Sequence, residues 1–191
     1  HSFVYRYSHG RGRWELVPNA TPIIRLALPR GFEARDLWQT FPALADYEDI
    51  HALLVSEEPE NGLILSENAM QPGEDMIRDM LQAPRLDSER SRRLLIEWLI
   101  HLLEGKQPSH EVRAQLHRLP LIELETLGNG ERKWESADAC KELLNEPPTL
   151  FRATDRSRKY GELLARVVKQ PQVSLCNTQP ELLRLLGIEV P

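Results

Sequence analysis

The sequence holds few of the residues that mark disulfide-rich, metal-binding or membrane proteins. Its 191 residues include only two cysteines and 6% aromatic residues, and no apolar run approaches the roughly 18 residues that a membrane-spanning helix needs. Cys140 and Cys176 lie far apart within apolar patterns, which favours two reduced, buried thiols over a disulfide framework. We therefore expect an intracellular, cytoplasmic protein that has no membrane as a partner.

Motifs for the better-known chemistries are also missing. The sequence has no C-x-x-C, H-E-x-x-H or G-x-S-x-G motif, and no Gly-Lys-Ser/Thr for a phosphate. Gly10 and Gly12 do not make a phosphate-binding loop, because a third glycine and a strand-to-helix setting are missing. The acidic residues and the histidine within 46–51 would not converge on one point of a helix. We expect no metal, no cofactor and no catalytic residue.

Charge is distributed unevenly along the chain, which carries a formal net charge of −5. Residues 1–35 contain six arginines against two glutamates, whereas residues 46–79 contain ten acidic residues against one arginine. A nucleic-acid binder that is basic throughout would not show this pattern. An acidic segment of this kind is usually a solvated face, although it can also dock onto a basic partner.

The strongest pattern predicts a helix from Leu86 to Lys106. At 3.6 residues per turn its leucines, isoleucines and Trp98 form a wide apolar face, and charged residues fall on the opposite side. Ser88 and its acidic neighbours are suited to cap the start, and Gly105 is suited to end the helix. Because such a helix must be buried on most sides, we place it at the centre of the fold.

The remaining predicted elements are short, and their apolar residues follow either the two-residue period of a strand or the 3.6-residue period of a helix. Apolar residues recur every second position in some runs and every third or fourth in others. The pattern predicts an α+β fold, with short, mostly antiparallel strands and hairpins packed against about six to seven helices. Strands are expected at 3–8, 13–17, 22–28, 63–65, 121–126, 131–134, 149–152 and 173–176, and further helices at 33–40, 42–55, 73–82, 109–118, 137–145, 155–169 and 181–186.

The length allows one sizeable domain or two small ones. Residues 1–70 are expected to form a strand-rich region with one or two helices. Residues 73–191 are expected to form a helix-rich α+β region, and the two regions can also be one continuous domain.

The first predicted hairpin places aromatic residues beside an arginine-rich turn. Phe3, Tyr5 and Tyr7 fall on one face of the strand at 3–8, and the turn residues at 9–12 include an arginine. Such a surface can stack the bases of single-stranded nucleic acid. Aromatic residues on one face of a strand are more often part of a core, so the sequence favours core packing.

A second arrangement with a functional meaning lies in the middle of the chain. Two helices and then a hairpin with a glycine tip follow one another in the order of a winged helix, in which helix 109–118 would read the nucleic acid and hairpin 121–134 would be the wing. Four glutamates on these elements would repel phosphates. The candidate nucleic-acid contacts are Arg113, His117, Arg118, Arg132 and Lys133.

Glu123 and Glu125 alternate onto one face of a predicted strand. Paired carboxylates can hold a divalent metal in a hydrolase, although such a site needs a third carboxylate. We favour a solvent-facing role in which Arg132 or Lys133 pairs with them across the hairpin. A metal-dependent hydrolase is the least favoured alternative.

A family resemblance rests on the second half of the chain. The run Leu119 to Thr126, the turn Gly128 to Gly130, and then Trp134 and Ser136 form a recurring element of an "LP" strand, a glycine turn, a strand and a serine-capped helix. Leu185 to Ile188 adds to the likeness, which covers about a third of the chain. The sequence resembles large multi-domain proteins of the sacsin type, which contain Hsp90-like ATPase modules. The resemblance implies a segment outside the ATPase, because the nucleotide-binding motifs are not recognisable here.

Taken together, these patterns predict a non-catalytic protein-interaction or scaffolding module. Because the chain starts at His1 without a methionine, directly in a strand-like run, we expect it to be excised from a larger intracellular protein. Its partners would be other domains of that protein or another protein. The alternative is a winged-helix-like nucleic-acid-binding domain.

Overall fold

The computed structural model describes residues 3–18, 21–57, 69–103, 107–127, 129–144, 150–151, 163, 173–176 and 180–189. The chain divides into two compact units, residues 1–112 and residues 113–191. The separation into regions 1–70 and 73–191 that the sequence suggests stays a prediction.

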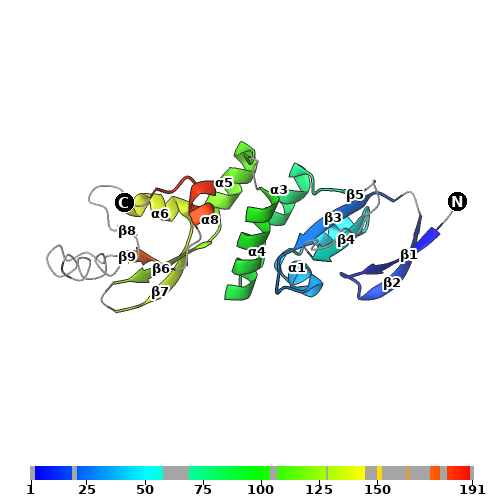
Figure 1. Cartoon of the computed structure of the whole chain (residues 1–191), viewed down its shortest axis with the longest axis horizontal. Coiled ribbons are helices and arrows are strands. Elements are labelled where there is room, and N and C mark those ends of the chain that lie inside the picture. Colours follow the sequence, from blue (N-terminus) through cyan, green and yellow to red (C-terminus); the bar gives the residue numbers. More distant parts are fainter. Residues whose placement is uncertain are drawn as a thin grey trace. The chain divides into compact units, whose positions relative to one another are not determined.

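The first unit begins with a β-hairpin, which Figure 1 shows at the N-terminal end of the chain. Strands β1 (Phe3–Ser8) and β2 (Arg13–Pro18) pair antiparallel, as the sequence predicts. The tight connection is possible because Gly12 adopts a φ of 63°, a left-handed conformation that glycine enters without steric cost. Among the described residues this hairpin forms a sheet of its own.

A separate three-stranded parallel sheet forms the centre of the first unit. Strand β3 (Ile23–Leu28) lies between β4 (Ala52–Glu57) and β5 (Ala69–Met70) and runs parallel to both. Ile24, Leu26 and Leu28 are buried, and the residues between them are half-buried. The parallel order follows from the crossover between β3 and β4, which contains α1 (Ala34–Thr40) and α2 (Leu44–Glu48).

The helix predicted at 42–55 is wrong. Only Leu44–Glu48 are helical, and Ala52–Glu57 form strand β4 instead. Ile50, which lies between these two elements, is 69% exposed. A short apolar run such as Ala52 to Val55 fits a buried parallel strand as well as a helix, and the available partner β3 decides between them.

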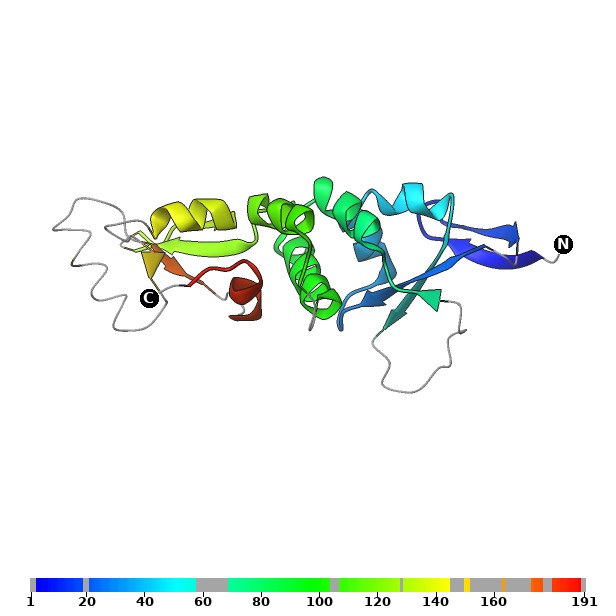
Figure 2. The same cartoon turned by 90° about the horizontal axis from the view of Figure 1, so that it is seen from above.

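Two further helices complete the first unit. Helix α3 (Glu74–Gln82) follows the short β5, and helix α4 (Glu89–Leu102) is the central helix that the sequence predicts. Ser88 caps α4, since its side chain accepts a hydrogen bond from the backbone N–H of Ser91. Figures 1 and 2 show α4 beside α1. The buried residues of α4 are Leu94, Leu95, Ile96, Trp98 and Leu99.

The second unit contains a four-stranded sheet in the order β7-β6-β9-β8. Strand β6 pairs antiparallel with both β7 and β9, and β8 pairs parallel with β9. The hairpin predicted at 121–134 is therefore confirmed, and β9 pairs with β6 on the side opposite β7. The strands are β6 (Ile122–Thr126), β7 (Arg132–Glu135), β8 (Leu150–Phe151) and β9 (Val173–Leu175).

Helices supply the core of the second unit together with the sheet. Helix α5 (His110–Arg118) contains the boundary between the units, and α6 (Ala137–Leu143) and α8 (Pro180–Leu185) belong to the second. Buried residues come from each of these elements, among them Leu116, Cys140 and Leu182. Both cysteines are buried and unbridged, as expected. The predicted strand at 63–65 and, apart from Leu163, the predicted helix at 155–169 lie outside the described residues.

The fold class is α+β, with seven helices and short sheets in the part of the chain that the structure describes. The parallel sheet around β3 was not predicted, whereas the two hairpins were. Within the same residues, no helix combines the length and the apolar character needed to cross a membrane.

Candidate functional site

The β1/β2 hairpin exposes an apolar face. Tyr7 lies opposite Trp14 in the register, and Leu16 lies two residues further along β2, so the three side chains belong to the same face. Tyr7 is 40% exposed, Trp14 68% and Leu16 55%. The expectation that the aromatic residues of this hairpin pack into a core is therefore wrong for Tyr7. Side chains of residues 3–6, which include Phe3 and Tyr5, lie outside the described set.

Four rings form a continuous aromatic row that starts on this face. The ring centroids of Trp14 and Tyr7 are 5.6 Å apart, those of Tyr7 and His9 are 5.2 Å apart, and both pairs meet edge to face. His9 in turn lies 4.6 Å from Trp38, a residue of α1. These separations fall in the range in which aromatic pairs attract one another. The aromatic row thus links the hairpin to the body of the first unit.

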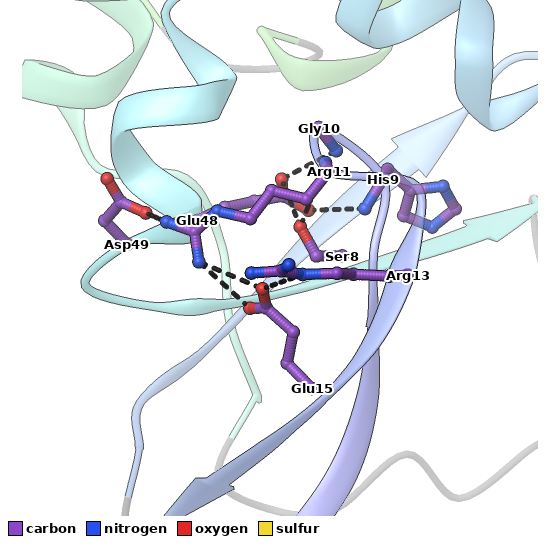
Figure 3. Close-up of polar contacts among 8 residues, drawn as sticks. All are labelled: Ser8, His9, Gly10, Arg11, Arg13, Glu15, Glu48 and Asp49. Atoms are coloured by element: carbon purple, nitrogen blue, oxygen red, sulfur yellow. Dashed lines mark hydrogen bonds and ion pairs between the residues drawn. The ribbon is translucent and has the colours of Figure 1, made fainter.

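A buried carboxylate holds the turn of the hairpin. Glu48, the last residue of α2, accepts hydrogen bonds from the backbone N–H groups of His9 and Gly10, both at 2.8 Å. The hydroxyl of Ser8 donates to the same carboxylate at 3.2 Å. Figure 3 shows the Glu48 carboxylate among these three donors. Glu48 is only 4% exposed, so these bonds replace the water that its charge would otherwise require.

Position 10 requires glycine for a steric reason. A Cβ atom built on Gly10 would lie 2.6 Å from Oε2 of Glu48 and 3.5 Å from the ring of Trp38. Carbon and oxygen atoms cannot approach to 2.6 Å without displacement, so any other residue would push the carboxylate away. The close approach of the turn to α2 therefore depends on the missing side chain.

Charged side chains surround the same turn (Figure 3). Arg11 forms ion pairs with Asp49 and with Glu15, the latter at 3.0 Å, and Arg13 reaches Glu15 at 3.1 Å. Hydrogen bonds from Arg11 and then from Arg13 lower the pKa of Glu15. With Glu48 included, this cluster carries two positive and three negative charges, which gives no net attraction for a polyanion.

The candidate nucleic-acid contacts of α5 differ in exposure. Arg113 and Arg118 are exposed, whereas His117 is half-buried. Nδ1 of His117 lies 3.5 Å from a carboxylate oxygen of Asp138 and 3.4 Å from Nζ of Lys141, both on α6. Burial lowers the pKa of His117, and the positive charge of Lys141 lowers it further. Its ring is therefore engaged with α6.

The candidate contacts of the wing are exposed but lie beside acidic residues. Arg132 is 3.6 Å from an oxygen of Glu123 and 3.8 Å from one of Glu125, as expected for pairing across the hairpin. Lys133 pairs instead with Glu135 at 2.9 Å. These neighbours reduce the positive potential that Arg132 and Lys133 would offer to a phosphate.

Glu123 and Glu125 are half-buried, and both pair with Arg132 across the hairpin, as the sequence predicts. The thiol of Cys176 lies 3.8 Å from Glu125, and burial together with the two carboxylates raises the pKa of that thiol. Among the described residues, no group of three or more His, Cys, Asp or Glu side chains could hold a metal ion.

Sequence reasoning missed the role of Glu48. Its acidic neighbourhood suggested solvated residues near a helix start, and the contact with the turn spans about 40 positions of the chain. The only local signal is the combination of Ser8 and Gly10 in a turn, which offers a hydroxyl and two unpaired N–H groups to an acceptor.

Comparison with known proteins assigns no relative to this fold or site. No family model, no curated protein and no solved structure matches the chain. The resemblance to sacsin-type proteins therefore stays a prediction from the residues of the second unit.

Proposed function

We propose that the chain is a non-catalytic protein-interaction module of an intracellular protein, and that it binds its partner through the exposed face of the β1/β2 hairpin. The observation that carries this proposal is the exposure of three large apolar side chains, Tyr7, Trp14 and Leu16, on one face of a two-stranded sheet. Contiguous exposed apolar surface of this kind is typical of interaction sites, and tyrosine and tryptophan dominate their binding energy.

The attachment of the hairpin supports the same proposal. Glu48 holds the turn through three hydrogen bonds, and the aromatic row continues from the hairpin to Trp38. A surface that is fixed before binding loses less conformational entropy on association. The edges of the hairpin also leave backbone groups available for an added strand, because no third strand pairs with it among the described residues.

The test places a photoreactive amino acid at position 14 of the full-length protein in cells. Position 50 is the matched control, because Ile50 is as exposed as Trp14, at 69% against 68%, and lies in the same unit. The proposal expects one defined protein partner that is crosslinked from position 14 and not from position 50. Equal crosslinking from both positions, or none from position 14, would contradict it.

Nucleic-acid binding by the middle of the chain is the second candidate. It is favoured by the order α4, α5, β6 and β7, which is that of a winged helix, and by the exposed Arg113 and Arg118. The paired Arg132 and Lys133 weigh against it. A labelled duplex should be retarded at low salt, and the double substitution Arg113→Ala with Lys133→Ala should abolish the retardation. Retardation that is unchanged by this substitution would exclude the winged-helix arrangement.

A further inference from the structure

The apolar area that the β1/β2 hairpin exposes is small. Tyr7 is 40% exposed, Trp14 68% and Leu16 55%, and the exposed parts of three such side chains together amount to an area on the order of 300–400 Å². A stable dimer, or a complex of two folded proteins, buries about 800 Å² on each partner. This face therefore fits one short segment of chain better than it fits a second copy of this protein.

The charged side chains around the turn of the hairpin compensate one another. Arg11 forms ion pairs with Asp49 and with Glu15. Arg13 also reaches Glu15. The buried carboxylate of Glu48 accepts three hydrogen bonds, so its charge is not presented to a ligand. A charged ligand would have to displace one of these partners, and charge complementarity therefore favours a segment without net charge.

The two exposed rings carry hydrogen-bond donors. The indole N–H of Trp14 can only donate, and the hydroxyl of Tyr7 can donate as well as accept. Both side chains contact other rings, and neither forms a hydrogen bond to a residue that the structure describes. A matching ligand has backbone carbonyl groups that are still unpaired. A helix uses its carbonyl groups internally, whereas a segment in the polyproline II conformation leaves all of them free.

The arrangement of the rings leaves an aromatic face open. Tyr7 and Trp14 meet at an interplanar angle of 67°, so they do not lie flat over one another. The 68% exposure of Trp14 shows that most of this side chain is accessible. Exposed aromatic faces are the surfaces on which proline-rich segments recurrently bind. Such a segment is extended before it binds, so it loses little conformational entropy on association.

We propose that the exposed face of the β1/β2 hairpin binds an uncharged, proline-rich segment of a partner protein in the polyproline II conformation. Proline rings of the segment pack on Trp14 and Leu16, and its carbonyl groups accept hydrogen bonds from Trp14 and Tyr7. This inference rests on the proposed function and specifies what occupies the interaction surface. A strand added to an edge of the hairpin would instead pair with backbone groups and leave the rings uncovered.

Crosslinking from position 14 separates the failure of this inference from the failure of the proposed function. The crosslinked peptide of the partner, identified by mass spectrometry, should come from a proline-rich segment. A crosslink to a helix, or to a second copy of this chain, would overturn the inference but leave the hairpin face as the interaction surface. The absence of any crosslink from position 14 would contradict both.

Titration of the isotope-labelled full chain with capped decaproline tests the inference directly. NMR follows the indole N–H resonances of the four tryptophans. The resonance of Trp14 should shift and saturate, and that of Trp98, which is 1% exposed, should not move. An uncharged Gly-Ser peptide of the same length is the control, because it has no preference for polyproline II. Equal shifts with both peptides, no saturable shift of Trp14, or shifts confined to the backbone amides of one hairpin edge would overturn the inference.

Conservative variants test the two donors. Tyr7→Phe and Trp14→Phe each keep an aromatic ring and remove the donor, so each should weaken decaproline binding by about threefold or more. Ile50→Ser is the control, because it removes an equally exposed apolar side chain from the same unit and should leave binding unchanged. A tenfold rise in salt should change the affinity by less than about twofold, because the complex contains no new ion pair. Unchanged binding in both phenylalanine variants, or a steep loss of binding with salt, would refute the proposed contacts.

Discussion

The carboxylate of Glu48 accepts the backbone N–H of Gly10 at 2.8 Å, although 38 positions of the chain separate them. This contact joins the end of α2 to the turn of the hairpin and holds the exposed aromatic face in a defined place. A hairpin of two strands is marginally stable by itself, so its order depends on such attachments.

Glu48→Ala should release the hairpin. The substitution leaves two backbone N–H groups and a buried hydroxyl without their acceptor, and should lower the free energy of unfolding of the first unit by about 2–4 kcal/mol. Hydrogen exchange at His9 and Gly10 should accelerate. Asp46→Ala, on the exposed side of the same helix, should change the free energy of unfolding by less than about 0.5 kcal/mol. Similar exchange in both variants would show that Glu48 does not hold the turn.

Gly10→Ala tests the same contact from the other side. The new Cβ would lie 2.6 Å from Oε2 of Glu48, so the turn or the carboxylate would have to move. That movement should lower the free energy of unfolding of the first unit by about 1–3 kcal/mol. Gly31→Ala is not a suitable control, because Gly31 has a φ of 85°. Gly73→Ala is better, since a Cβ there meets nothing within 4 Å. Thermal unfolding of the two variants should differ clearly if the contact is present.

Trp98→Ala should be among the most damaging substitutions in α4. Trp98 is 1% exposed and its ring lies 5.2 Å from that of Phe41. The cavity left behind should cost about 3–5 kcal/mol, measured by denaturant unfolding. Glu97→Ala, one position away on the polar side, should cost less than about 0.5 kcal/mol. A small effect of Trp98→Ala would mean that α4 is not central to the core.

The stability of the second unit should fall as the pH is lowered through about 6.5, the ordinary pKa of histidine. Burial, with the charge of Lys141, lowers the pKa of His117 in the folded state, so the unfolded chain binds the proton first. The stability that neutral His117 confers is thus complete above its unfolded pKa and declines below it. Chemical denaturation at several pH values measures this, and His117→Gln should flatten the slope. An unchanged slope in this variant would exclude His117 as its source.

Acid should weaken the first unit through Asp36. Hydrogen bonds from Arg90 lower the pKa of this carboxyl, and the backbone N–H of Glu33 lowers it further. Its contribution is therefore complete above the unfolded pKa of about 4 and is lost as the pH falls through the folded value. Arg90→Ala should move the acid-unfolding midpoint to higher pH. Arg93→Ala should leave that midpoint in place, because Arg93 pairs with Glu97 instead.

The elements that the sequence predicted well are those in which apolar residues keep one clear spacing or in which glycines mark a turn. Helix α4 has a wide apolar face and a cap at Ser88, and both hairpins carry glycine at their turns, so local signals and packing agree. The run Ala52 to Val55 was assigned to the predicted helix 42–55 because the apolar residues before it recur at helical spacing. The four apolar residues of the run carry no period of their own, and only pairing with β3 makes them a strand.

The candidate site was harder to predict from the sequence, because contacts between distant parts of the chain decide it as well. Alternation correctly placed Tyr7 on one face of β1, but a period of two does not say whether that face is buried. The attachment of the turn to Glu48 joins distant parts of the chain, and no local pattern encodes it. The sequence therefore predicts which side chains share a face better than it predicts whether that face is buried.

The most direct test of the proposed interaction surface is the affinity for the partner that is crosslinked from position 14, measured with the purified protein. Trp14→Ser should weaken that affinity by about tenfold or more, because exposed tryptophans at the centre of an interface dominate its binding energy. Ile50→Ser, which removes an equally exposed apolar side chain from the same unit, should leave the affinity unchanged. Equal affinity of Trp14→Ser and the unmodified chain would contradict the account.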